Sequence, residues 1–341
     1  MRFLSVVLSI LAIPATASEL KILSDLPAVQ SLVTMVAGDR IETGIISVSS
    51  DPHHGALRPS EARALTKADV IIWIGPELSP WLERPVGELA QNARVVELST
   101  VADTLRLPVA SSLGEEVADH DHVDKHDSDH ADEHHGHDDE AKENHNAHDH
   151  NAHDHDGDHD DEARHYDHRH SSSGIDPHLW LDPRNAAVWL TEIAKVLSQE
   201  DPEYSKQYEA NAEAAASRLA EVELEIADKL TGFEPRYGIA HDSLGYFENR
   251  FGVSNVAAIA DSDAATPGPR RVASARAAIE EMEATCILVE VYDEKRLPVD
   301  GLPKVRIDLT GTTLEAGAEL YPTLLLGIAD ALVTCSTLKS P

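Results

Sequence analysis

Histidine is the residue type with which this chain could do the most chemistry, and its distribution is uneven. The sequence has 20 histidines, and 16 of them lie in the 56 residues from Glu115 to His170. Asp and Glu fill most of the positions between them. Imidazole and carboxylate groups are the ligands that proteins offer to Zn²⁺ and related divalent ions. The composition of this segment therefore indicates metal capture.

The same segment is not expected to form a packed core. It carries 21 acidic residues against four Lys and Arg, which gives it a net charge of −17 out of −33 for the chain. Its few larger apolar side chains cannot offset the entropy of ordering. A solvated acidic linker would have the same charge, but it has no need of so many histidines. We therefore predict a disordered loop over 115–170 with auxiliary metal-binding histidines, namely His120, His122, His126, His130, His134, His135, His137, His145, His148, His150, His153, His155, His159, His165, His168 and His170.

Only four histidines lie outside this loop: His53, His54, His178 and His241. All but His54 are predicted at or just after the end of a strand, where open α/β domains bind their ligands. Three imidazoles with an optional carboxylate suit Zn²⁺ at about 2.0–2.2 Å. Any one of them alone would more simply be a satisfied loop or core residue, but together they favour a zinc site. His54 adjoins His53 and could replace it as a ligand, although adjacent loop residues usually point apart.

Carboxylates close to these histidines could complete or orient the site. Asp308 follows a predicted strand at 305–307 and is a candidate fourth ligand. Asp51, Asp176 and Asp242 each lie within two residues of a histidine. They are candidates to orient ring N–H groups. Turn or capping chemistry explains the two Asp-Pro pairs among them equally well.

The elements around these residues alternate between strands and helices, which predicts parallel sheets. The stretch 202–230 contains neither Gly nor Pro after its first residue and predicts a helix of roughly 40 Å. The fold class is therefore α/β, with two Rossmann-like lobes that have a parallel sheet each and are joined by one long helix. The predicted strands are 20–23, 41–48, 70–74, 94–98, 237–240, 253–260, 287–291 and 305–307, and the other predicted helices are 27–38, 59–68, 80–91, 185–197, 272–284 and 316–333.

The N-terminus has the pattern of a cleaved secretory signal. Arg2 precedes an apolar run, and Ala15-Thr16-Ala17 is a small-residue cleavage pattern. The run is too short to span a bilayer, and no later segment is expected to reach that length. The predicted domains are a signal peptide at 1–17, an N-terminal lobe at 18–184 that contains the loop, helices at 185–231 and a C-terminal lobe at 232–341.

Export to a bacterial periplasm, the simplest destination, has two consequences. That compartment is oxidising, so Cys286 and Cys335 are expected to form a disulfide, with two buried thiols as the alternative. The acidic balance argues against nucleic acid and anionic membrane surfaces as partners. It is compatible with the attraction of cations.

Three sequence motifs point to one family of proteins. The sequence resembles the metal-binding proteins of bacterial ABC importers that have two lobes joined by a rigid helix, and most of all the ZnuA-type periplasmic zinc-binding proteins. The resemblance covers essentially the whole mature chain, and an acidic histidine loop is a further hallmark of the zinc members. The motifs are Pro-His-His-Gly-Ala-Leu-Arg-Pro-Ser at 52–60, Asp-Pro-His-Leu-Trp-Leu-Asp-Pro at 176–183 and His-Asp-Ser-Leu-Gly-Tyr-Phe at 241–247.

The resemblance implies particular ligands. His53, His178 and His241 match the family's three ligating histidines, and a histidine at the third position is typical of zinc rather than manganese members. Asp308 matches the aspartate ligand of the broader group, which in zinc members can give way to water or another carboxylate. Glu290 is a weaker candidate.

Two further positions bear on the match. Cys286 and Cys335 match a C-terminal disulfide of zinc members. Some relatives have a carboxylate directly before the first histidine and an aromatic residue two positions after it. Here these positions hold Pro52 and Gly55.

We therefore predict a monomeric periplasmic receptor, and not an enzyme, that binds Zn²⁺ in a cleft between the lobes. Its partners would be the membrane permease of an ABC zinc importer and periplasmic zinc chaperones, without membrane insertion. Affinity should fall as the pH drops through roughly 6.5, because imidazole must be neutral to bind. The alternatives are a manganese or other divalent-metal receptor of the same fold, a zinc hydrolase and a plain metal buffer.

Overall fold

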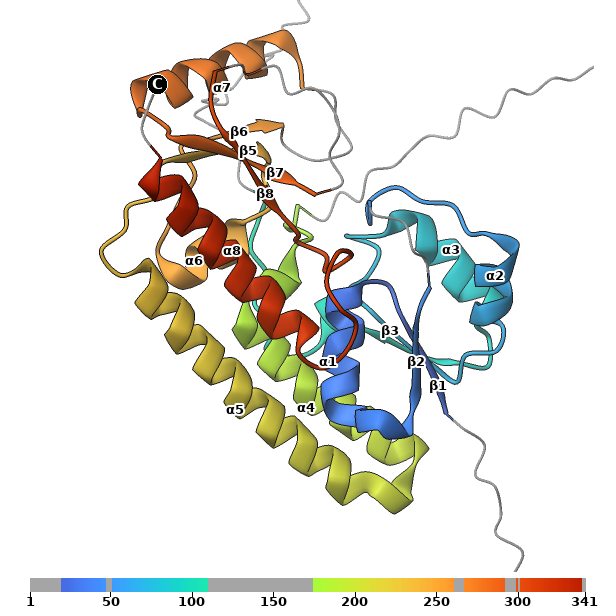
Figure 1. Cartoon of the computed structure of the whole chain (residues 1–341). Helices are drawn as coiled ribbons and strands as arrows, with labels where there is room; N and C mark the ends of the chain where they lie inside the picture. The colour runs from blue at the N-terminus through green and yellow to red at the C-terminus, as the bar shows by residue number, and fades with distance from the viewer. Residues whose placement is uncertain are drawn as a thin grey trace, which may run out of the picture. The chain divides into compact units, whose positions relative to one another are not determined.

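The computed structural model describes residues 20–46, 51–109, 174–260, 267–291, 299 and 301–338. The predicted signal peptide and the predicted histidine-rich loop lie outside these residues and stay predictions. Within them, two four-stranded parallel sheets are flanked by helices (Figure 1). The predicted α/β fold class with a parallel sheet in each half is confirmed.

The first sheet has the strand order β2-β1-β3-β4. All four residues of β3, Val-Ile-Ile-Trp, are buried, as expected for a strand covered on both faces. On one face α1 packs over Ile22 and Ile72, and on the other α2 and α3 pack over Ile71 and Trp73. The elements of this half are β1 (Lys21–Ser24), α1 (Pro27–Ala37), β2 (Glu42–Ile45), α2 (Pro59–Leu65), β3 (Val70–Trp73), α3 (Pro80–Leu89) and β4 (Arg94–Glu97).

The second sheet repeats the arrangement with the order β6-β5-β7-β8. Every residue of β5 and β7 is buried. A disulfide joins Cys286 to Cys335 with a Cα–Cα distance of 5.5 Å, so the expected pairing is confirmed. It ties the start of β7 to the closing helix. The elements are β5 (Tyr237–His241), α6 (Gly245–Phe251), β6 (Ala257–Ala260), α7 (Pro269–Glu281), β7 (Cys286–Glu290), β8 (Lys304–Ile307) and α8 (Leu320–Thr337).

Two helices, α4 (Pro183–Glu200) and α5 (Ser205–Leu230), lie between these halves in the sequence. At 26 residues, α5 is about 39 Å long. It packs against α4, against α1 of the first half and against α8 of the second. Its buried side chains recur every three or four residues, so one stripe of the helix serves both halves. They are Tyr208, Ala212, Ala215, Leu219, Val222, Ile226 and Leu230.

The motif at 176–183 is anchored to the second half through Trp180, which is fully buried. Its indole Nε1 donates to the carbonyl oxygen of Leu309 at 2.6 Å. The Tyr321 hydroxyl donates to the carbonyl oxygen of Trp180, also at 2.6 Å. The loop before α8 therefore holds the indole of Trp180, and α8 itself holds its backbone carbonyl group.

Helix α8 is 18 residues long and, within the described residues, is the one helix apolar enough to cross a membrane by length and composition. The expectation that no later segment would reach that length is therefore wrong. Ten of its residues are buried in the protein, and it packs against α5, α1 and β8. Its apolar character is accounted for by the core.

Some predicted boundaries were also wrong. The closing helix begins at Leu320 and not at residue 316. Gly317 has a φ of +139°, and its carbonyl oxygen accepts a hydrogen bond from the Ser31 hydroxyl. The strand predicted from residue 253 begins at Ala257, because Asn255 instead donates from its backbone and side-chain nitrogens to Glu248.

A buried carboxyl group lies directly after β1. Asp25 is 7% exposed. Its Oδ2 accepts a hydrogen bond from the Ile74 backbone at 2.9 Å, and its Oδ1 has no hydrogen-bond partner in the described part of the chain. Burial raises the pKa of Asp25 from 3.8 to about 7, although the hydrogen bond from Ile74 opposes the rise. Folding therefore stabilises the protonated form of Asp25 relative to its carboxylate.

This raised pKa predicts a pH-dependent stability. Because the folded-state value lies above the unfolded one, the stabilisation is complete below about pH 3.8 and is lost as the pH rises to about 7. Asp25→Asn removes the titration and keeps an acceptor for Ile74. We expect the wild type to lose up to about 4 kcal/mol of unfolding free energy relative to the variant between pH 4 and 7. Urea unfolding over this range measures it, and a constant difference would contradict the assignment.

Candidate metal centre

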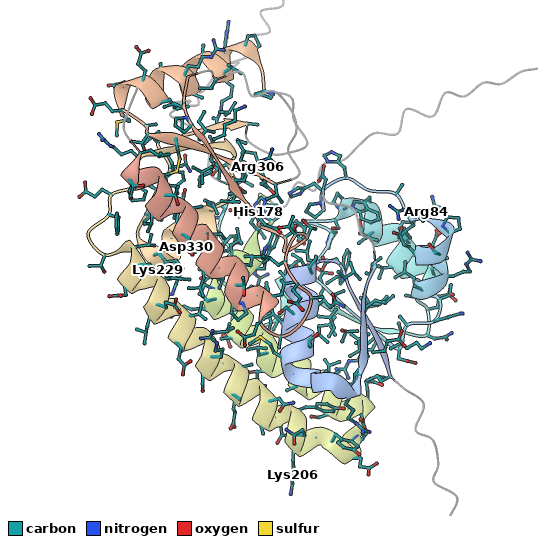
Figure 2. All side chains as sticks on the ribbon, in the orientation of Figure 1. Arg84, His178, Lys206, Lys229, Arg306 and Asp330 are labelled. Atoms are coloured by element: carbon teal, nitrogen blue, oxygen red, sulfur yellow. A yellow bond between two sulfur atoms is a disulfide. The ribbon has the colours of Figure 1, made fainter. Side chains whose placement is uncertain are left out.

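Three histidines from separate segments meet at one point. His53 lies in the loop after β2, His178 directly precedes a 3₁₀ turn, and His241 is the last residue of β5. Their ligand nitrogens lie within 4.8 Å of one another. His178 and His241 are 4% and 3% exposed, and His53 is half-buried. Figure 2 shows His178 between the side chains of the two α/β halves.

Buried carboxylates hold two of these rings. Asp176 Oδ1 lies 2.8 Å from His178 Nδ1, and Glu290 Oε1 lies 3.0 Å from His241 Nδ1. The hydrogen bond from His178 to Asp176 assigns the ring proton of His178 to Nδ1. The negative charge of Glu290 beside His241 Nδ1 favours the proton on that nitrogen as well. The Nε2 atom of each ring then carries a lone pair, which is the form that binds a metal.

The two Nε2 atoms face each other at 3.4 Å. With both Nδ1 atoms protonated, neither neutral ring can donate to the other, and the lone pairs of His178 and His241 repel. A divalent cation placed between them removes the repulsion and gains two nitrogen ligands. The arrangement of these two rings therefore favours a cation.

The surroundings of the rings are negative. Burial raises the pKa of Asp242, and the nearby Asp176 carboxylate adds to the rise, whereas His178 and His241 oppose it. Asp176, Asp242 and Glu290 thus lie around the three imidazoles. Asp242 was a predicted orienting partner, but the structure pairs Glu290 with the ring of His241. Asp176 contacts His178 as expected.

The loop that carries His53 is organised by Asp51. Asp51 Oδ1 accepts hydrogen bonds from the backbone nitrogens of His53 and His54 at 2.9 and 3.2 Å. Its Oδ2 lies 3.1 Å from His54 Nδ1. The His54 side chain is 54% exposed and does not belong to the three-histidine group. Of the two neighbouring histidines, His53 joins the group and His54 lies beside Asp51 instead.

Asp308 is not brought into the group. Its Oδ1 accepts hydrogen bonds from the backbone of Gly311 at 2.7 Å and of Thr310 and Thr312 at 3.2 Å. Its Oδ2 accepts from the backbone and hydroxyl of Thr313 at 2.7 and 2.6 Å. This carboxylate therefore caps the turn after β8, and its lone pairs are used there.

Sequence reasoning missed how α6 supports Asp176. A Cβ atom on Gly245 would lie 2.8 Å from Asp176 Oδ2, so glycine lets the carboxylate approach the start of the helix. The Tyr246 hydroxyl donates to the carbonyl oxygen of Asp176 at 3.1 Å and accepts from Leu107 N at 2.9 Å. The third motif thus positions the second, a relation that spacing alone does not reveal.

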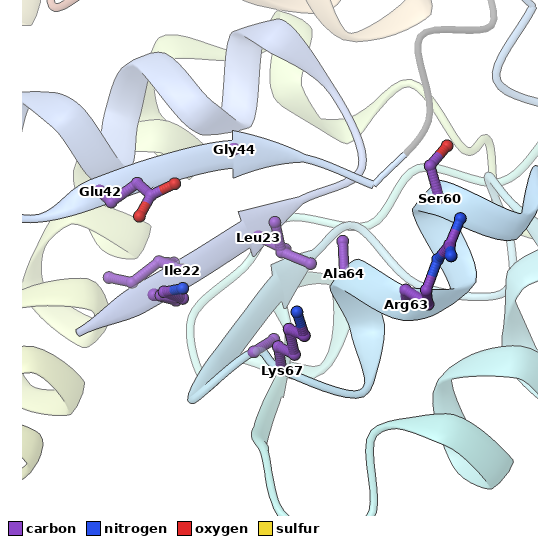
Figure 3. A pocket seen from close by; sticks show the side chains of 10 residues that line it. Ile22, Leu23, Glu42, Gly44, Ser60, Arg63, Ala64 and Lys67 are labelled. Atoms are coloured by element: carbon purple, nitrogen blue, oxygen red, sulfur yellow. The ribbon is translucent and has the colours of Figure 1, made fainter. Parts of the chain in front are cut away.

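A separate hollow of about 470 Å³ lies against the first sheet near α2 (Figure 3). Its charged lining consists of Lys21, Arg63, Lys67 and Glu42, all of which are exposed. It shares no residue with the three-histidine group. Three cations around one carboxylate do not provide ligands for a divalent metal.

Comparisons with known proteins agree with this geometry. The family model described as zinc-uptake complex component A, periplasmic, matches residues 22–335. The high-affinity zinc uptake system protein ZnuA of Paracoccus denitrificans (strain Pd 1222) is 40% identical over 97% of this chain and 96% of its own. The ZnuA of Brucella abortus (strain 2308) is 36% identical over 85% and 84%.

A crystal structure of ZnuA has the same fold. It has a TM-score of 0.65 at 16% identity and covers 94% of this chain and 100% of its own. The match of the family model spans most of the chain, from β1 to α8. The chain therefore belongs to the ZnuA family, the periplasmic component A of zinc-uptake complexes.

Proposed function

We propose that this protein captures Zn²⁺ with His53, His178 and His241 and delivers it to the membrane permease of an ABC importer. One observation carries the proposal. Three imidazoles converge within 4.8 Å, and buried carboxylates turn the Nε2 atoms of two of them toward each other. The relatives named for high-affinity zinc uptake support zinc as the cargo.

The ligand set favours zinc over manganese. Imidazole nitrogens suit Zn²⁺, whereas Mn²⁺ prefers carboxylate, carbonyl and water oxygens. A protein of the same fold from Pseudomonas aeruginosa, FpvC, has been solved with Mn²⁺, with a TM-score of 0.66 at 16% identity. At that identity the likeness concerns the fold alone. Copper would bind three imidazoles more tightly than zinc, so selectivity must rest on geometry and supply.

A fourth ligand from solvent completes the proposed centre. Asp308 is committed to its turn, and Glu290 is committed to His241. An open position is also typical of zinc hydrolases. We favour binding over catalysis because the ligands come from both α/β halves, which suits a clamp that closes on an ion. Turnover of ester or peptide substrates by the zinc-loaded protein would revive the alternative.

The remaining features fit export and capture. A signal peptide at 1–17 would direct the chain to the periplasm, and the lobes at 18–184 and 232–341 would be joined by the helices at 185–231. The loop at 115–170 would raise the local zinc concentration with weaker sites, because each must order a flexible segment to bind. Gly174 is hydrogen-bonded to Val109 at 2.9 Å. The sequence therefore leads from the end of the loop, through Gly174, to His178 within eight residues.

The first test is His178→Ala. Loss of a buried ligand should lower zinc affinity by more than about 100-fold. His54→Ala is the matched control, because its ring is exposed, and its affinity should stay within about threefold of the wild type. Titration against a chromophoric chelator measures both. A plain metal buffer, in which the loop does the binding, would leave the affinity of His178→Ala unchanged.

Deletion of residues 119–170 tests the auxiliary role of the loop. The variant should keep one tight zinc site and lose the weaker ones, because the three ligating histidines lie outside the deleted segment. Isothermal titration gives the stoichiometry of each class. If the tight site disappears with the loop, the proposed assignment of ligands is wrong.

Two carboxylates can be compared directly. Glu290→Gln keeps the size of the side chain but removes the charge that holds the His241 ring, and zinc affinity should fall about 10- to 100-fold. Asp308→Asn should weaken the turn after β8 and lower the unfolding free energy, with affinity within about threefold of the wild type. The opposite ranking of the two affinities would make Asp308 a ligand.

A further inference from the structure

The loop that carries His53 presents a different problem from the other two ligands. His241 lies in a strand and His178 directly before a helical turn. His53 lies in a segment that is neither strand nor helix and is only half-buried. Ligands on loops are held less accurately than ligands on regular elements. Something must therefore fix the backbone of this loop.

The peptide unit between Pro52 and His53 is held at both of its polar ends. Its N–H, on His53, donates to Asp51 Oδ1 at 2.9 Å. Its carbonyl oxygen, on Pro52, accepts two hydrogen bonds of 2.9 Å, one from the Trp81 indole Nε1 and one from the Ser79 hydroxyl. Because the peptide unit is planar, holding both ends fixes the direction in which the chain enters His53.

The indole of Trp81 also packs against the loop on the other side of His53. A Cβ atom placed on Gly55 would lie 2.6 Å from the Trp81 ring atoms Cε2 and Cζ2. Real Cβ atoms do not approach ring atoms so closely, so Gly55 leaves room for the indole. Trp81 thus contacts the residues before and after the pair His53-His54. It sits in the first turn of α3, which begins at Pro80, and so is carried by a regular element.

We propose that Trp81 is a positioning residue for zinc capture: through Pro52 and Gly55 it holds the loop so that His53 meets the other two histidines. The inference rests on the proposed function, because it assumes that His53 is a ligand. No contact between the indole and the metal is required. Because Trp81 acts through His53 alone, its replacement should matter only while His53 is present.

Trp81→Phe removes the indole N–H and keeps an aromatic ring. We expect the zinc affinity of the full chain, measured by competition with a chromophoric chelator, to fall about tenfold. Trp73→Phe is the matched control. Its Nε1 is buried and has no hydrogen-bond partner in the part of the chain that the structure describes, so its replacement should change affinity by less than about twofold. Ser79→Ala, which removes the other donor to Pro52, should lower affinity as well.

The His53→Ala background separates positioning from a general effect on folding. Without a ligand at this position, Trp81→Phe should change the remaining zinc affinity by less than about twofold, because coupled residues do not add. An equal loss in both backgrounds would show that Trp81 acts through the fold, and the inference would be wrong. The inference would also be wrong if Trp81→Phe bound zinc like the wild type while His53→Ala bound it more weakly. If His53→Ala itself binds like the wild type, the proposed zinc site fails instead.

Discussion

The proposed metal centre depends on the contacts that two buried carboxylates make with two imidazoles. Asp176 and Glu290 each hold the Nδ1 atom of a histidine, and these contacts decide which nitrogen of the ring is left for a ligand. They leave the Nε2 lone pairs of the two rings facing each other at 3.4 Å. That separation is unfavourable between two lone pairs and favourable with a cation between them. The free protein is therefore already arranged for the ion.

Most of the fold serves to keep these groups in place. Parallel sheets bring strand ends to one edge, so β5 ends at His241 and its neighbour β7 ends at Glu290, which places the ring beside its carboxylate. The anchoring of Trp180 between Leu309 and Tyr321 fixes the segment that carries His178. The packing of α5 against helices of both halves adds a support that spans them. The proposed third ligand, His53, follows Pro52, whose carbonyl oxygen accepts hydrogen bonds from Ser79 and Trp81 at the start of α3.

The sequence was a good guide to the class of fold and to which histidines meet, and only a partial guide to their partners, because Asp51 and Asp176 contact histidines as predicted whereas Glu290 and not Asp242 lies beside His241. Alternating strand and helix patterns predicted both sheets, because a strand buried on both faces is apolar throughout. Asp308 was chosen for its place after a strand, yet nothing in a strand end says whether a carboxylate faces a ligand or caps its own turn. For the same reason the sequence did not reveal that Glu290, also at a strand end, lies beside His241. The bond from Trp81 to Pro52 joins residues 29 positions apart, and no local pattern predicts such a contact.

The most direct test is X-ray absorption at the zinc edge on the full chain loaded with one equivalent of Zn²⁺, combined with a zinc-bound crystal structure. Three imidazole nitrogens at about 2.0–2.1 Å, from His53, His178 and His241, and one light ligand from solvent are expected. Asp176 and Glu290 should stay on the Nδ1 atoms and not on the metal. A centre built from Asp308, or from histidines of the 115–170 segment, would contradict the account.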